Sequence, residues 1–206
     1  MPEQPADARQ RRTRAALYAA VLELAAERDP GEITVTSLAE RAGVHRSTVY
    51  EHGGSPIEVL QRALAEELDV LREVHLRDVP PQRVGEALRD VTLGVFAHVD
   101  HYAAVYRNLD AASGATLHAF LSEHFQTSTR MLLAQSSLAI PFEVEGVDAQ
   151  HVEDAAVRYI ADGVVGLIAV WLHEPRPRNP QVQLALLGHL MPSWWPAAGD
   201  PELRRA

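Results

Sequence analysis

The chain has 206 residues, of which 47% are hydrophobic and 23% charged, and this is the composition of a globular protein with a substantial core. It contains no cysteine, which excludes a disulfide framework, a thiolate metal site and a cysteine nucleophile. The net charge is −9, so the chain as a whole is not a generic polyanion binder.

The N-terminal segment is polar and lacks the apolar core of a signal peptide. The longest apolar run, Gly163 to Leu172, is too short to span a bilayer. We therefore expect a cytoplasmic protein that does not enter a membrane.

The charge is unevenly distributed. The first fifty residues hold seven arginines and seven acidic residues, so the rest of the chain carries the whole −9. Four of these arginines cluster near the N-terminus, at positions 9, 11, 12 and 14. A local basic cluster on an otherwise acidic protein is able to hold phosphates while the acidic body limits non-specific binding.

In chain order, the first predicted helix runs from about Ala8 to Arg28. Apolar residues recur there at helical spacing and give one buried face: Leu17, Val21, Leu24 and Ala25. The sequence Asp29-Pro30-Gly31 ends this helix.

The next stretch, Thr34 to His52, is typical of two short helices joined by a tight turn. Thr34 is a good N-cap residue, and Gly43 follows where a helix stops and the chain turns. A second short helix then carries Val49 inward and its polar residues outward. Such a helix-turn-helix places its second helix in the DNA major groove.

An ordered set of residues in this stretch resembles the DNA-binding domain of the TetR family of transcriptional regulators. The set is Ile33-Thr34-Val35, Leu38-Ala39, Ala42-Gly43-Val44, Thr48-Val49-Tyr50 and His52, preceded by Thr13-Arg14 in the first helix. The resemblance runs from Thr13 to His52. It implies an N-terminal three-helix DNA-binding domain, residues 1–53, and a C-terminal all-helical regulatory and dimerisation domain, residues 54–206.

The resemblance also implies which residues contact DNA. The positions that match those facing DNA are Thr36, His45, Arg46, Ser47 and Thr48, and those that match positions reaching the phosphates are Tyr50 and His52. Arg46 offers two donors to guanine, and Thr48 a methyl group to thymine. From the basic cluster we add Arg12 as a phosphate contact. The alternatives are a solvated helix face for Arg46 and Ser47 and a packing role for Tyr50.

Three positions depart from the family pattern. His45 stands where a serine-like residue is frequent, and Pro56 where a lysine often touches phosphate. Gly53 stands where a bulky apolar residue is usual, so we expect it to remove packing between the recognition helix and the next helix.

The rest of the chain is predicted to be helical. Ser55-Pro56-Ile57-Glu58 is a helix start with a capping box, and the helix runs to about His75. Further helices are expected at 81–98, 101–109, 113–138, 148–173 and 179–191, with a loop at 139–147. The sequence shows no strand-like alternation, so the fold class is all-α.

The predicted helix at 148–173 is apolar on more than one face, which means burial on nearly all sides. It is either a central core helix or a dimer interface. The resemblance favours a homodimer formed by the last two helices. The expected interface residues are Val157, Ile160, Val164, Ile168, Trp171, Leu184 and Leu187.

Aromatic and polar residues on the middle helices form a candidate pocket for a small-molecule effector, as the resemblance implies. They are Phe96, His98, Tyr102, Tyr106, Phe120 and His124, and each is about equally well explained as a core residue. No carboxylate or cysteine signature accompanies the histidines, so we expect neither a metal nor another cofactor.

The leading hypothesis is therefore a homodimeric repressor that binds a double-stranded DNA operator and is released by a small molecule. The alternative is an interaction protein of the same fold that has lost operator binding, suggested by Gly53, Pro56 and the acidic body. An enzyme is disfavoured, because the sequence has no Gly-rich phosphate loop, nucleophile elbow or run of metal ligands.

Overall fold

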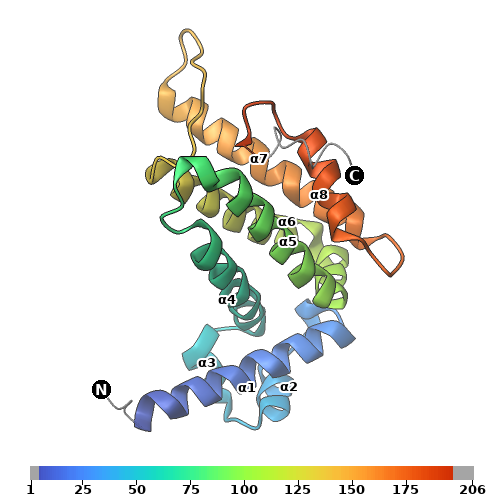
Figure 1. The fold of residues 1–206 in the computed structure, drawn as a ribbon. Coiled ribbons are helices and arrows are strands. Elements are labelled where there is room, and N and C mark those ends of the chain that lie inside the picture. The colour runs from blue at the N-terminus through green and yellow to red at the C-terminus, as the bar shows by residue number, and fades with distance from the viewer. Residues whose placement is uncertain (1–4, 197–206) are drawn as a thin grey trace. The chain divides into compact units, whose positions relative to one another are not determined.

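The structure, a computed structural model, describes the backbone of residues 5–196 and the side chains of residues 9–108 and 118–196. The described residues form eight α-helices and two 3₁₀ turns without a strand (Figure 1), which confirms the all-α class. The helices are α1 Pro5–Glu27, α2 Val35–Ala42, α3 Arg46–Gly53, α4 Pro56–Leu76, α5 Val84–His101, α6 Ala103–Ala134, α7 Ala149–Leu172 and α8 Pro180–Leu190; the 3₁₀ turns are Pro30–Glu32 and Pro81–Arg83.

The chain divides into two compact units. The first consists of residues 1–67 and 102–114, and the second of residues 68–101 and 115–206. Two helices, α4 and α6, contribute residues to both units. The functional division expected after residue 53 stays a prediction.

The core of the first unit follows the predicted pattern. The side chains of the α1 stripe, Leu17, Val21, Leu24 and Ala25, are at most 2% exposed. Leu38 of α2 and Val49 of α3 are fully buried as well. Helix α1 packs against α2, and α2 packs against α3 (Figure 1). The short helices are thus held by one apolar face each, since helices of eight residues are not stable alone.

One helix, α6, is longer than the sequence predicted. The expected break between 109 and 113 is absent, and residues 103–134 form a single helix. This prediction was wrong because the alanines around Ser113 and Gly114 are strong helix formers and an isolated glycine within a helix is tolerated.

In the second unit α5, α7 and α8 pack against one another (Figure 1). The rings of Phe96 and Trp171 meet edge to face with centroids 4.9 Å apart. Gly94 allows a close approach of α4, because a Cβ there would lie 2.7 Å from Cδ2 of Leu71. These contacts join residues that are far apart in the sequence.

Among the described helices α7 alone is long and apolar enough to cross a membrane. The uninterrupted apolar run Gly163 to Leu172 is shorter than this helix, so the run alone did not predict it. Of the most apolar stretch of α7, 44% is buried against the rest of the chain. The core helix of a globular protein can have the same length and composition, so these two properties of α7 are weak support for a membrane segment.

Candidate functional sites

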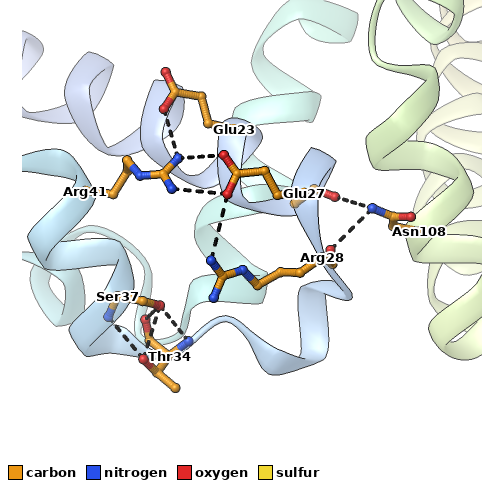
Figure 2. A network of polar contacts seen from close by, with 8 residues as sticks. Glu23, Glu27, Arg28, Thr34, Ser37, Arg41 and Asn108 are labelled. Carbon is orange, nitrogen blue, oxygen red and sulfur yellow. Dashed lines mark hydrogen bonds and ion pairs between the residues drawn. The ribbon is translucent and has the colours of Figure 1, made fainter.

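The turn between α2 and α3 is fixed by its local sequence. Thr34 caps α2: its Oγ1 accepts from the backbone N–H of Ser37 at 3.0 Å, and the Ser37 hydroxyl oxygen accepts from the Thr34 N–H at 3.1 Å (Figure 2). Gly43 ends α2 with φ +66°, in the left-handed region that suits glycine. Val44 follows, and the chain turns directly into α3.

Helix α3 has one buried and one exposed face. Val49 is fully buried beneath it, while Tyr50 is 60% exposed. The exposed residues include His45, Arg46 and Ser47. Arg46 and Ser47 lie in the first turn, the part of a recognition helix that contacts base edges.

The other predicted contact residues lie around this surface. Thr36, Thr48 and His52 are half-buried, and Arg12 on α1 is exposed. His45 occupies the N-cap of α3 without a side-chain hydrogen bond to the backbone, so α3 begins without the cap that serine would provide. Glu51 is exposed too and adds a negative charge near Tyr50.

Gly53 brings α3 and α4 together. It is buried, and a Cβ at this position would lie 2.4 Å from Cγ2 and 3.1 Å from the backbone nitrogen of Val59. The expectation that Gly53 removes packing was wrong, because the fully buried Val59 fills the space of the missing side chain. Arg62 of α4 also donates to the carbonyl of His52, near the end of α3.

Ser55 and Pro56 begin α4 as predicted. The Ser55 Oγ accepts from the Glu58 N–H at 3.3 Å, and its hydroxyl donates to the Glu58 carboxylate at 3.1 Å. The Glu58 carboxylate therefore accepts from the Ser55 hydroxyl, and not from the Ser55 backbone N–H as in the usual capping box. Pro56 at the first helical position offers no charge to phosphate.

Several arginines of the first unit are bound to carboxylates. Arg41 forms ion pairs with Glu23 and Glu27 at 3.2 and 3.1 Å (Figure 2), and these carboxylates raise the pKa of Arg41. Arg14 pairs with Glu66 at 3.3 Å. In the N-terminal cluster, the charge of Arg14 is therefore offset by a carboxylate of α4.

Asn108 is a contact that the sequence analysis did not single out. Its Nδ2 donates to the carbonyl oxygens of Ala25 at 2.8 Å and Arg28 at 3.3 Å, at the end of α1 (Figure 2). The C-terminal carbonyls of a helix have no partners within the helix, so Asn108 supplies one from α6. An asparagine inside a predicted helix gives no sequence signal for such a role.

The second unit contains an apolar cavity of about 80 Å³. Its walls come from α4, α5, α6, α7, α8 and the segment after α8. The lining residues are Leu76, Leu88, Val91, Thr92, Val95, Phe96, His124, Phe125, Ser128, Thr129, Leu132, Ile160, Val164, Ile168, Leu184, Leu187, Gly188, Met191 and Trp195.

His124 is the titratable residue on this wall. Its Nδ1 lies 3.5 Å from Nη1 of Arg72 and 3.6 Å from Oδ1 of Asp69, and Arg72 and Asp69 are ion-paired at 2.6 Å. Burial lowers the pKa of His124 to about 4, and the positive charge of Arg72 lowers it further than Asp69 raises it. The imidazole is therefore neutral at neutral pH.

The six expected pocket residues are not all at the cavity. Phe96 and His124 line it. His98, which is buried, and Phe120, which is half-buried, belong to the second unit but do not line this cavity. The two tyrosines belong to the first unit.

Both tyrosines contact α4 or the core of the first unit. Tyr102 donates to Glu67 at 2.7 Å, and burial together with this carboxylate raises its pKa to about 12. Tyr106 is fully buried, which raises its pKa. Both tyrosines were expected at the pocket with Phe96 as aromatic residues of the middle helices, but they follow the end of α5 at His101 and belong to the first unit.

The expected interface residues also need correction. Six of the seven are buried within the single chain, at 1–8% exposure, and therefore serve as core: Val157, Ile160, Ile168, Trp171, Leu184 and Leu187. The seventh, Val164, is half-buried and lines the cavity. Because α7 is apolar on more than one face, its sequence did not indicate which face packs inside the same chain.

A different face of the same two helices is exposed and apolar. On α7 it comprises Tyr159, Gly163, Gly166 and Val170, and on α8 Val182, Leu186 and Leu190. These residues recur every three or four positions, so they form one stripe on each helix. A Cβ added at Gly163 or Gly166 would meet no atom within 4 Å.

No group of three or more histidine, aspartate or glutamate side chains among the described residues is placed to hold a metal ion.

No protein-family model and no curated protein sequence matches the chain. The solved structures do show similarity.

Three solved structures resemble this one over most of its length. A tetR-family transcriptional regulator from Streptomyces coelicolor is 23% identical, with TM-score 0.54, covering 92% of this chain and 86% of its own. A TetR transcriptional regulator from Streptococcus agalactiae is 18% identical, with TM-score 0.60, covering 88% and 94%. The fatty acid degradation regulator FadR from Bacillus halodurans is 14% identical, with TM-score 0.56, covering 94% and 98%.

The chain therefore has the fold of TetR-family transcriptional regulators: an N-terminal helix-turn-helix and a C-terminal helical body. At these identities the likeness concerns the fold. What the two sites do has to be argued from their own residues.

Proposed function

We propose that this chain is a DNA-binding transcriptional regulator and that α3 is its recognition helix. The observation that carries the proposal is the exposed face of α3, where Arg46, Ser47 and Tyr50 lie above the fully buried Val49. Arg46 makes no ion pair within the described side chains, so its guanidinium is available to a guanine edge. Such a regulator acts in the cytoplasm and has no catalytic step.

A second copy of this chain is the proposed partner in the regulator. The exposed apolar stripes of α7 and α8 are the proposed contact, in place of the buried residues first expected. Gly163 and Gly166 leave room for a helix of the second copy to approach closely. A two-fold dimer would present two copies of α3 to a palindromic operator.

The dimer is tested by charge substitution. Val170→Glu with Leu186→Glu introduces charges into the stripes, and we expect the mass in sedimentation at micromolar concentration to fall from dimer to monomer. Val74→Glu is the control, because Val74 is 70% exposed and lies on α4. A monomeric wild type at high concentration would overturn the dimer.

An effector in the cavity is proposed to release DNA, which makes the protein a repressor. Helices α4 and α6 support this coupling, because each contributes residues to both units. Leu76 and His124 on these helices line the cavity, while Arg62 and Asn108 on the same helices hold the ends of α3 and α1. A ligand that favours one arrangement of the cavity walls would therefore also favour one arrangement of Arg62 and Asn108 and of the ends of α3 and α1 that they contact.

DNA binding is tested by titrating the protein with the region upstream of its own gene and with a genomic library at several salt concentrations. Arg46→Ala should weaken specific binding by about 1 to 3 kcal/mol and relax sequence preference. Tyr50→Phe should weaken binding to all sequences, because it removes only the hydroxyl that donates to phosphate. Arg77→Ala, in the turn directly after α4, is the matched control, because Arg77 is an exposed, ion-paired arginine.

The second candidate is an interaction protein of this fold without an operator. The exposed Glu51 beside Tyr50 and the uncapped start of α3 favour it. A folded dimer that shifts no genomic fragment at low salt would replace the proposed regulator by this candidate.

A further inference from the structure

The cavity wall of the second unit carries no formal charge. Its lining residues include no aspartate, glutamate or arginine, and the one histidine among them, His124, is neutral at neutral pH. A carboxylate or ammonium group in this cavity would have no counter-ion at the wall. Burying an unpaired charge in apolar surroundings is strongly unfavourable.

The hydroxyl groups on the wall are already committed as donors. Thr92, Ser128 and Thr129 each donate to the carbonyl oxygen four residues earlier in their own helix, at 2.6, 3.1 and 3.0 Å respectively. Their oxygens retain lone pairs, but their protons are occupied. The hydroxyls therefore offer little to an acceptor on a ligand.

His124 supplies a donor instead. Both of the polar contacts of its ring, to Arg72 and to Asp69, go through Nδ1. Arg72 only donates and lies within hydrogen-bond distance of Nδ1, at 3.5 Å, whereas the acceptor Asp69, at 3.6 Å, lies just beyond it; we therefore assign Nδ1 as the acceptor and place the proton of the neutral ring on Nε2. The Nε2–H is therefore the donor that His124 retains for a molecule in the cavity it lines.

We propose that the effector is an uncharged, mainly apolar molecule whose carbonyl oxygen accepts a hydrogen bond from His124, as in a ketone, ester or lactone. The inference rests on the proposed function, because it takes this cavity as the effector site. Arg72 behind His124 does not favour an anion, since its charge is already compensated by Asp69 at 2.6 Å. A cationic molecule would have no carboxylate on the cavity wall with which to form an ion pair.

The size of the cavity limits the first probes. At about 80 Å³ it is smaller than an engineered cavity of about 150 Å³ that binds benzene. Small probes of one shape and different charge are therefore the right test, and larger effectors must widen the cavity.

The test uses four probes built on a five-membered ring: cyclopentanone, cyclopentane, cyclopentanecarboxylate and cyclopentylammonium. Binding to the full-length protein at neutral pH is measured by ligand-observed NMR and by the shift of the thermal unfolding midpoint. We expect cyclopentanone to bind at least ten-fold more tightly than either charged probe, and several-fold more tightly than cyclopentane. Equal or tighter binding of the carboxylate or the ammonium would overturn the inference.

Substitutions test whether the ketone preference depends on the N–H donor of His124 or on the shape of the cavity alone. His124→Leu should reduce the affinity for cyclopentanone to that for cyclopentane, while His124→Gln, which keeps an N–H donor, should restore part of the preference. Thr127→Val is the matched control, because Thr127 lies outside the cavity lining and the hydroxyl it removes donates to the carbonyl of Glu123 in the same way, so it should leave all affinities within two-fold. A ketone preference that survives in His124→Leu would show that His124 is not the donor.

Val164→Phe narrows the cavity from a half-buried position and should abolish binding of every probe in a protein whose circular dichroism is unchanged. Binding of none of the probes to the wild type would also overturn the inference. These measurements involve no DNA. If the ketone binds as expected but never changes operator affinity, the ligand class stands and the proposed release from DNA fails.

Discussion

The two units of this molecule are specified in different ways. In the first, the signals are local: Thr34 caps α2 from within its own turn, and Gly43 ends the same helix. In the second, the contacts join distant positions, as between Phe96 and Trp171 or between Asp100 and Arg178. A helix-turn-helix can thus be recognised from a short stretch, whereas a cavity exists only once several helices have packed.

The largest expected effect concerns a long-range contact of the second unit. The guanidinium of Arg178 is 1% exposed and is bound to Asp100 at 2.5 Å. Asp100→Ala would leave this charge buried with two backbone carbonyls and the Trp171 ring but no counter-ion, and should lower the free energy of unfolding by about 3 kcal/mol in urea titrations. Asp154→Ala, which breaks an exposed pair with Arg130, should cost less than about 1 kcal/mol. Equal effects would mean that Arg178 does not depend on Asp100.

The second effect is a dependence on pH that originates at His124 in the second unit. The pKa of His124 is about 4 in the folded chain, against 6.5 for a free histidine. Because the unfolded chain binds this proton first, stability is complete above pH 6.5 and is lost as the pH falls toward 4. The loss between pH 7 and pH 5 should be about 2 kcal/mol.

Urea unfolding of the wild type and of His124→Leu at both pH values measures this loss. The variant cannot titrate at this position, so the difference between the two proteins isolates His124 from the neighbouring Asp69, Arg72 and His98. A loss of stability that is the same in both proteins would assign the pH dependence to other groups.

The sequence predicted most of the first unit correctly. The α1 stripe, the cap at Thr34 and the turn at Gly43 follow from spacing and residue type, which act over a few positions. The role of Gly53 was misjudged because its close neighbour, Val59, became visible only when α3 and α4 were placed together.

In the second unit the sequence predicted helices but not their faces. The apolar residues of α7 were identified, yet periodicity gave no means to distinguish Ile168, which is buried, from Val170, which is exposed. Phe96 and His124 were found as aromatic and polar residues, whereas Thr92 and Ser128 carry no signal that would place them at a cavity. The DNA-contact residues themselves stay predictions.

Gly53→Ala probes a position of the first unit that local signals did not explain. The added Cβ would clash with Val59, whose side chain is fully buried. We expect a loss of about 1 to 3 kcal/mol in stability, together with weaker DNA binding because α3 is displaced. In the Val59→Ala background the same change should cost less, and a cost that is unchanged there would show that the backbone contact, at 3.1 Å, dominates.

The smallest expected effect concerns the cap of α2, where the first unit depends on a single local hydrogen bond. Thr34→Ala removes the acceptor of the Ser37 N–H and should lower the free energy of unfolding by about 1 kcal/mol. Thr34→Asp should retain most of the stability, because aspartate accepts the same bond and suits the positive end of the helix. Because Thr34 is not itself a predicted contact, its loss should lower stability while leaving the affinity of the folded protein for DNA within about two-fold. A larger loss of affinity would mean that the position of α3 depends on how firmly α2 begins, and the two short helices would then have to be treated as one unit.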